Sequence, residues 1–142
     1  MIRISKLSDY ALVIMGYMGK NPDYVAQTSD IALNTHISKP TAAKILKRLA
    51  KHNLLESIRG TSGGYKLTKA PSSISVANII EVIEGPMAIM DCSLGQEHCA
   101  MYSNCGINAP WVQINRVIIK SLDTIKVSDL QAIAKQHGNA NE

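Results

Sequence analysis

The chain has 142 residues, of which 46% are hydrophobic and 18% charged, and this suits one modest globular domain or a small domain with an oligomerisation appendage. No apolar run approaches the length of a membrane span and the first residues lack a signal-peptide pattern, so we expect a cytoplasmic protein. Residues 1–70 carry eleven lysines and arginines against four acidic residues, whereas residues 71–142 carry four against seven. A basic half that faces a polyanion is typical of nucleic-acid binding, with a merely solvated basic face as the alternative.

Two helices are predicted in the first part of the chain. Residues 9–20 place apolar side chains at helical spacing, with Ser8 as the expected N-cap. After a turn, Thr28 or Ser29 is expected to cap a second helix that ends near Asn34.

A third helix is predicted from an N-cap at Ser38 to Lys51. Its apolar residues Ile45, Leu46 and Leu49 form one stripe, and basic residues fill most of the remaining surface. A helix, a turn and a basic helix are typical of a helix-turn-helix motif, whose second helix enters the DNA major groove with its first turns near base edges. The residues of this helix expected to contact DNA are Ser38, Lys39, Pro40, Thr41, Lys44, Lys47 and Arg48.

A glycine-rich hairpin is predicted to follow. Residues 54–59 and 65–68 resemble short strands, and the tip between them contains three glycines. Such a wing lets the backbone approach phosphates closely, so Arg59, Gly60 and Ser62 are further candidate DNA contacts. A flexible hairpin without a ligand is the alternative.

The second half of the chain predicts a short helix and a long one. Ser75 is the expected cap of a helix that ends at residues 85–86, and apolar residues recur at helical spacing from about Pro110. The stripe of the long helix fits either an ordinary core or contact with a second copy of the chain. Past Gln131 the sequence predicts a disordered polar tail.

Three cysteines, Cys92, Cys99 and Cys105, lie in a loop with the spacing C-x6-C-x5-C. This is neither the C-x2-C of structural zinc sites nor that of dithiol oxidoreductases. Soft thiolates suit iron-sulfur clusters, copper(I) or zinc, and clusters ordinarily have four ligands, so one ligand is missing. A metal-free thiol sensor of redox state or nitric oxide is an alternative, and a thiol oxidoreductase is a second one that no partner motif supports.

Several motifs together resemble one family. Residues 7–12, 37–49 and 58–67, followed by the three cysteines, are similar to the IscR and NsrR family of winged-helix regulators. Residues 39–47 and the step at 84–86 are most similar to the regulators of SUF-type iron-sulfur assembly operons. The resemblance implies a mainly α fold with a small β-wing, in which the winged helix-turn-helix spans 1–85, the cysteine loop 86–109, the dimerisation helix region 110–131 and the polar tail 132–142.

The resemblance also implies a function. It predicts a homodimer on a pseudo-palindromic operator in double-stranded DNA, acting as a repressor that senses an iron-sulfur cluster and not as an enzyme. In the IscR subgroup a His completes the ligand set, but Asn108 occupies that position here. In the NsrR subgroup an Asp from the other subunit does so, and Asp9 matches it, with a carboxylate that only stabilises the first turn of its helix as the alternative. His98 is a second candidate. The expected cofactor is a [2Fe-2S] cluster, with [4Fe-4S] as the alternative.

Overall fold

Helices make up most of the chain, and one hairpin forms its only sheet among the residues described. The computed structural model describes residues 3–138, with side chains as far as residue 132. In that range, no helix combines the length and apolar character that crossing a bilayer requires. The elements are α1 (Lys6–Met18), α2 (Thr28–Thr35), α3 (Lys39–Lys51), β1 (Leu55–Ile58), β2 (Gly64–Leu67), α4 (Val76–Glu84), α5 (Asn108–Thr124) and α6 (Val127–Gly138). The predicted class, mainly α with a small wing, is confirmed.

The start of α1 differs from the sequence prediction, because Ser5 and not Ser8 is its N-cap. Ser5 has extended backbone (φ −67°, ψ 156°), and its hydroxyl accepts a hydrogen bond from the Ser8 N–H at 3.2 Å. The serine three residues before the predicted cap takes the role. Ser8 lies inside the helix and is fully buried.

The second helix also begins without the predicted side-chain cap. Gln27 occupies the N-cap position of α2, and neither Thr28 nor Ser29 caps the helix. At its other end, His36 adopts a left-handed conformation (φ 57°) and turns the chain toward α3. The start of α3 is as predicted, since Ser38 is its N-cap residue, although the Ser38 hydroxyl donates to Thr41 Oγ1 at 2.8 Å and accepts no hydrogen bond from a backbone N–H of the helix.

The core lies where α1, α2, α3 and α4 meet the base of the wing. On α3, the core residues Ile45, Leu46 and Leu49 are those of the predicted apolar stripe, and such packing explains why short helices are stable in the context of the domain. The largest fully buried apolar side chains are Ile14, Met15, Ile31, Ile45, Leu46, Leu49, Leu55, Ile74, Ile79 and Val127.

The wing is held to the helix-turn-helix by backbone pairing. β1 and β2 are antiparallel, with Leu55 opposite Leu67. On the other side of β2, Ala26 and Tyr65 exchange hydrogen bonds of 2.9 and 2.8 Å. This approach requires a glycine at Gly64, because a Cβ there would lie 2.3 Å from the Ala26 carbonyl oxygen. The hairpin therefore leaves the domain in a defined direction.

The C-terminal helices differ from the predicted arrangement, because the region 110–131 is not one helix. α5 ends at Thr124, and the chain pairs at this point with the residues before α4: Val76 N–H donates to the Ile125 carbonyl and Val127 N–H to the Ile74 carbonyl, each at 2.9 Å. Helical structure then continues in α6 to Gly138, where a disordered polar tail was expected from residue 132. Residues 139–142 lie outside the described residues.

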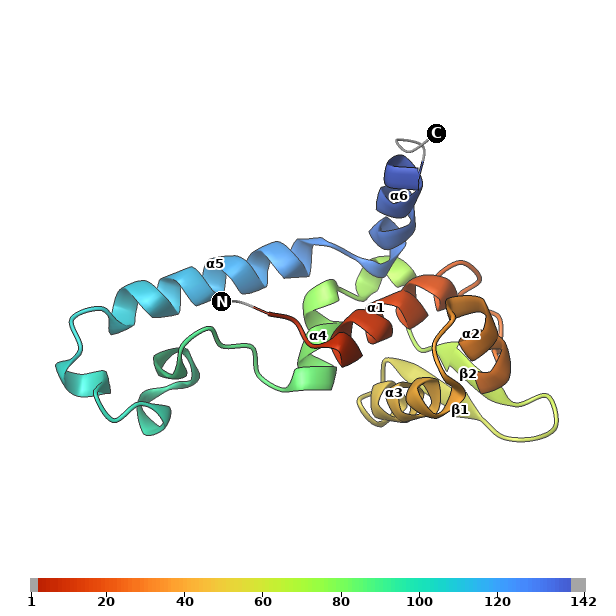
Figure 1. Ribbon diagram of the computed structural model, residues 1–142, viewed down its shortest axis with the longest axis horizontal. Coiled ribbons are helices and arrows are strands. Elements are labelled where there is room, and N and C mark those ends of the chain that lie inside the picture. Colours follow the sequence, from red (N-terminus) through yellow and green to blue (C-terminus); the bar gives the residue numbers. More distant parts are fainter. Residues whose placement is uncertain (1–2, 139–142) are drawn as a thin grey trace.

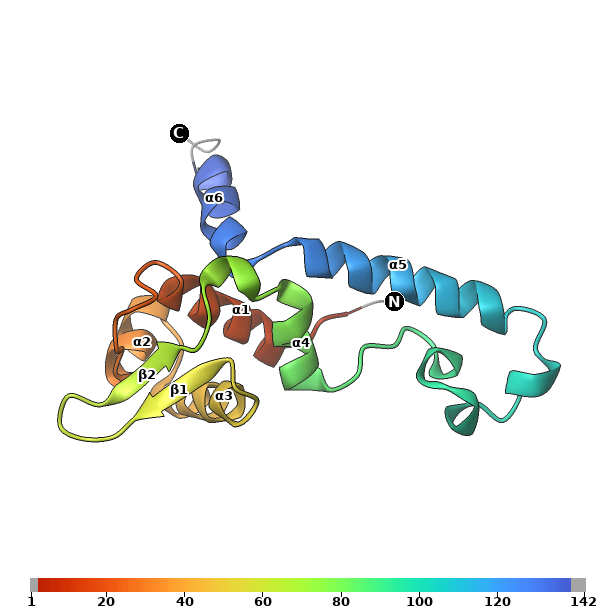
Figure 2. The ribbon, with the colours of Figure 1, turned by 180° about the vertical axis from the view of Figure 1, so that it is seen from behind.

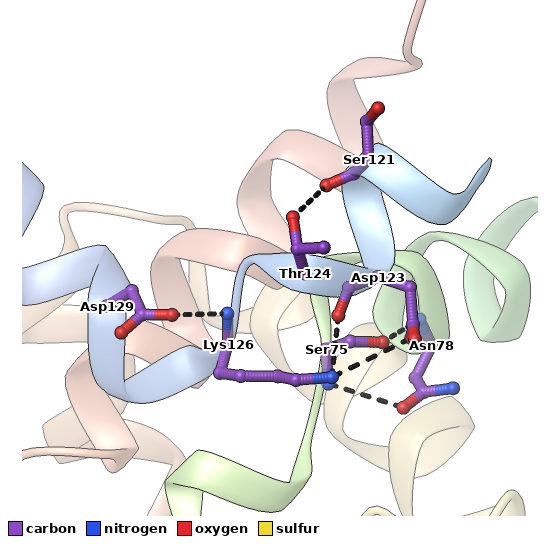
Figure 3. A network of polar contacts seen from close by, with 7 residues as sticks. All are labelled: Ser75, Asn78, Ser121, Asp123, Thr124, Lys126 and Asp129. Carbon is purple, nitrogen blue, oxygen red and sulfur yellow. Dashed lines mark hydrogen bonds and ion pairs between the residues drawn. The ribbon is translucent and has the colours of Figure 1, made fainter. Parts of the chain in front are cut away.

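Polar groups reinforce this turn between α5 and α6 (Figure 3). Lys126 Nζ donates to the Asp123 carbonyl at 2.6 Å, and Lys126 N–H donates to the Asp129 carboxylate at 2.8 Å. Asp129 lies in the first turn of α6, where a carboxylate is favoured by the helix dipole. Ser75 and Asn78 form a reciprocal capping box at the start of α4 in the same region.

The wing and the cysteine loop lie at opposite ends of the molecule (Figures 1 and 2). In both views, α5 extends away from the body formed by α1 to α4, and the segment between α4 and α5 lies at the far end from the hairpin of β1 and β2 (Figures 1 and 2). Short 3-10 turns at Asp91–Leu94, Gln96–His98 and Tyr102–Asn104 make up much of that segment.

Loss of the α4 cap should destabilise the fold measurably. The Ser75 hydroxyl accepts from the Asn78 N–H at 3.1 Å and is fully buried, so Ser75→Ala should lower the free energy of unfolding by about 1 kcal/mol. Urea denaturation followed by circular dichroism measures this change. Ser72→Ala, at an exposed position just before the cap, is the control and should leave the midpoint unchanged. Equal midpoints for both variants would contradict the assignment.

Candidate functional site

The exposed face of α3 is basic, whereas its opposite face is buried. Lys44, Lys47 and Lys51 recur at spacings of three and four residues and therefore lie along one side of the helix. Among the residues whose side chains are described, 3–132, no lysine of α3 forms an ion pair with a carboxylate. Of the predicted DNA contacts on this helix, Ser38, Lys39, Pro40, Lys44, Lys47 and Arg48 are exposed and Thr41 is half-buried.

The predicted wing contacts are also exposed. Arg59, Gly60 and Ser62 lie at the hairpin tip, and Gly60 has a positive φ of 114° that suits glycine. The Gln27 side chain at the start of α2 donates to the Thr61 carbonyl at 3.4 Å, so the tip contacts the helix-turn-helix directly. Exposed cations on both α3 and the wing can thus bind a phosphate backbone.

The three cysteines are free thiols in different environments. Cys92 is buried, with 7% of its surface exposed, whereas Cys99 and Cys105 are half-buried. Cys92 lies in the Asp91–Leu94 turn, which packs against α5. Cys99 and Cys105 follow the next two short turns of the loop.

The structure does not bring the predicted ligands together. Among the described residues, no group of three or more His, Cys, Asp or Glu side chains is placed to hold a metal ion. Asp9 is exposed on α1, beside a hollow that Arg3, Lys6 and Glu84 also line. His98 is exposed, with its Nε2 atom 3.7 Å from a Glu97 oxygen. Three thiols suit cluster iron chemically, but a single chain in this conformation does not assemble the site.

Sequence reasoning missed Asn115, which is buried in α5 with 7% of its surface exposed. Its Oδ1 accepts from the Ile89 N–H and its Nδ2 donates to the Met87 carbonyl, both at 3.1 Å. The signal available in the sequence was one polar residue among the apolar positions of the long helix. The partners could not be deduced, because they are backbone atoms of an irregular segment.

A second missed contact joins the end of α4 to the start of α1. Glu84 Oε1 accepts from Ser8 Oγ at 2.6 Å and from the Ser5 N–H at 3.1 Å. Hydrogen bonding from Ser5, and then from Ser8, holds the pKa of Glu84 below its usual value of 4.5, with a smaller contribution from the charge of Arg48. The carboxylate also lies at a helix N-terminus, where negative charge is favoured.

Comparison with known proteins identifies the relationships of the chain. Residues 4–133 match the family model of Rrf2, described as an iron-dependent transcriptional regulator. The HTH-type transcriptional regulator NsrR of Bacillus licheniformis is 29% identical over 134 residues, which cover 93% of this chain and 92% of that protein. A putative HTH-type transcriptional regulator of Aquifex aeolicus is 27% identical over 130 residues, covering 90% of each chain.

Solved structures share the fold. The structure of CymR, the global cysteine regulator of B. subtilis, is 27% identical and superimposes with a TM-score of 0.74, covering 94% of this chain and 98% of that one. IscR of T. potens has a TM-score of 0.70 at 23% identity, over 96% of this chain and 90% of that one. The winged helix-turn-helix with a long following helix is therefore an arrangement found in both.

The contact of Glu84 with α1 predicts a pH-dependent contribution to stability. Because the folded-state pKa is lowered, the stabilisation is complete above the ordinary pKa and is lost as the pH falls through the folded value. Glu84→Gln should therefore lower the Tm by a few degrees near neutral pH, and the difference from the unmodified chain should shrink below about pH 4. Differential scanning calorimetry across this range measures it, with exposed Glu81→Gln on the same helix as control. A Tm difference that does not change with pH would contradict the contact.

Proposed function

Because the chain belongs to the Rrf2 family of transcriptional regulators, we propose that it represses a SUF-type iron-sulfur assembly operon and senses an iron-sulfur cluster through Cys92, Cys99 and Cys105. The coarser function, DNA-binding regulation of transcription, follows from the family, which consists of regulators and not of enzymes. The thiol oxidoreductase considered from the sequence is thereby rejected. The single observation that best supports the DNA-binding role is the row of exposed cations on α3 opposite a buried apolar stripe.

DNA recognition would use α3 and the wing together. The first turns of α3, with Lys39, Thr41 and Lys44, are the part of a reading helix that approaches base edges in the major groove. Farther along, Lys47 and Arg48 are suited to phosphates, which position the protein without reading sequence. Arg59 at the wing is suited to the minor groove.

A homodimer would match the two-fold symmetry of a pseudo-palindromic operator, because each copy would present one α3 and one wing. On α5, the side chains of Ile114 and Val117 are 44% and 54% exposed in the single chain, although both are apolar. Pairing of this helix with its counterpart would remove apolar surface from water. The two copies of α3 in a two-fold dimer would then match half-sites about one DNA turn apart.

The cysteine loop would supply the signal input. Three soft sulfur donors in one loop support ligation of cluster iron, and the family description as iron-dependent agrees with this. Asp9 of the second subunit is the first candidate for the fourth ligand and His98 the second, while [2Fe-2S] is the expected cluster and [4Fe-4S] the alternative. When bound, the cluster would supply a chemically labile link among the thiolates. Because no group of three ligand side chains is assembled among the described residues, the loop would have to close around it.

Packed helices of the chain would connect the cysteine loop to α3. The segment leaves α4 directly after Glu84, whose carboxylate contacts the first turn of α1, and α1 packs against α2 and α3. A change in loop order can thus reach the reading helix through packed elements. A coupling of about 1–3 kcal/mol, the ordinary range for linked sites, would change DNA affinity from roughly 5-fold to 150-fold.

A metal-free thiol sensor is the second candidate. The observation in its favour is that three thiols lie within one loop, from Cys92 to Cys105. Two of them, Cys99 and Cys105, are half-buried and therefore accessible to oxidants once the loop moves. Oxidation to disulfides or sulfenic acids would then carry the redox or nitric-oxide signal.

Removal of an α3 cation should weaken DNA binding and its salt dependence together. Lys47→Ala should lower the affinity for a fluorescent mixed-sequence duplex of about three helical turns, and the slope of log K against log salt should fall by about 0.9 for the lost phosphate contact. Fluorescence anisotropy in a salt series measures both. Lys120→Ala on α5 removes the same charge from another exposed helix and should change neither. Equal effects of the two variants would contradict a specific role for α3.

The cluster proposal predicts bound iron and sulfide. Protein purified without oxygen should contain both and absorb visible light, and changing Cys92, Cys99 or Cys105 singly to Ala should abolish or greatly reduce all three signals. Ser103→Ala in the same loop is the control and should retain them. A colourless, iron-free, oxygen-protected wild type would contradict the cluster. Oxidant-dependent mass shifts at the thiols of that metal-free protein would then favour the direct thiol sensor.

A further inference from the structure

The side chain of Asn115 forms hydrogen bonds with the backbone of the segment that leads into the cysteine loop, in place of a neighbouring backbone strand. The chain between α4 and the Asp91–Leu94 turn is irregular, so its N–H and C=O groups need partners from elsewhere. The Asn115 amide supplies an acceptor for Ile89 N–H and a donor for the Met87 carbonyl, each at 3.1 Å. This is the hydrogen-bonding pattern that a neighbouring strand residue would otherwise provide.

Asparagine suits this buried position because its side chain can both accept and donate a hydrogen bond. A buried amide is costly unless both of its ends are satisfied, and here both are. Leu or Ile would suit the apolar surroundings better but could neither accept from Ile89 nor donate to Met87. Asp could accept but not donate, and would bring a negative charge toward the Met87 carbonyl oxygen. The side chain therefore fixes the segment to α5 by two specific bonds.

The segment 87–89, which Asn115 holds by these two hydrogen bonds, ends three residues before Cys92. The turn that carries Cys92 packs against α5 and buries the thiol, whereas Cys99 and Cys105 lie farther along the loop and are half-buried. We propose that Asn115 is a positioning residue that holds Cys92 against α5 as the fixed sulfur of the sensor, onto which the other two thiols close. The inference rests on the proposed sensing role of the cysteines, and it assigns Asn115 no direct contact with the signal.

The experiment measures the accessibility of each thiol in reduced, metal-free protein. Iodoacetamide labelling, followed by mass spectrometry of the separate peptides, gives one rate for each cysteine. In the wild type, Cys92 should react at least about tenfold more slowly than the other two, because a buried thiol reacts only after local opening. Asn115→Asp should raise the Cys92 rate by roughly tenfold, the effect of losing one buried hydrogen bond, while the rates at Cys99 and Cys105 stay within about twofold.

Gln113→Glu is the matched control, since it makes the same amide-to-carboxylate change at an exposed position of α5. It should leave all three rates unchanged. Asn115→Ala, which adds no charge, should accelerate Cys92 as well, and circular dichroism of each variant verifies that the helices are intact. If Asn115→Asp does not fold, the rates of Asn115→Ala decide the outcome. Unchanged Cys92 labelling rates in the folded Asn115 variants, or equal acceleration of all three thiols, would overturn the positioning role of Asn115.

A second measurement separates this inference from the proposed function. After anaerobic reconstitution with iron and sulfide, Asn115→Asp should retain less iron than Gln113→Glu, because one of its three sulfurs is no longer held in place. Equal iron retention would overturn the role of Asn115 in the sensor even if the labelling rates differ. A wild type that takes up no iron would instead refute the cluster, and the labelling rates would still decide whether Asn115 holds Cys92.

Discussion

The arrangement of the molecule depends on the backbone pairing between Ile74–Val76 and Ile125–Val127. Its two hydrogen bonds join the turn between α5 and α6 to the residues on either side of Ser75, the cap of α4, and the buried Val127 side chain extends the core of the helix-turn-helix. The close approach of Val127 requires Gly19, because a Cβ at that position would lie 2.7 Å from Val127 Cγ1. The direction in which α5 leaves the domain is thereby fixed relative to α3.

This pairing also explains where sequence reasoning succeeded and failed on the fold. The helix α3 was predictable because a strong apolar stripe, a capping serine and a tolerated Pro40 all agree. The break between α5 and α6 was not, since no glycine or proline interrupts residues 111–131 and a tertiary pairing ends the helix there. The start of α1 was misplaced for a different reason: Ser8 is buried and donates to Glu84, a tertiary contact that the sequence does not reveal, while the Ser5 hydroxyl caps the helix.

The candidate site was predictable in its chemistry but not in its geometry. Exposed lysines on one helix face and thiols in one loop are properties of residue type and spacing, which the sequence contains. Whether Cys92 is more buried than Cys99 depends on packing against α5, which comes from elsewhere in the chain. Asn115 is the clearest case, because its function is defined entirely by two backbone atoms more than twenty residues away. Burial of a single amide in an apolar helix could have indicated a structural partner, but not its identity.

The anchoring of the cysteine loop at both ends has a thermodynamic consequence. Glu84 fastens the chain where it leaves α4, and α5, into which the loop returns, packs against α4. The entropy of ring closure is therefore already lost on folding, and drawing the thiols together costs only the ordering of the residues between them. A segment held at both ends therefore loses less entropy when its thiols are drawn together than an unattached segment of the same length would lose.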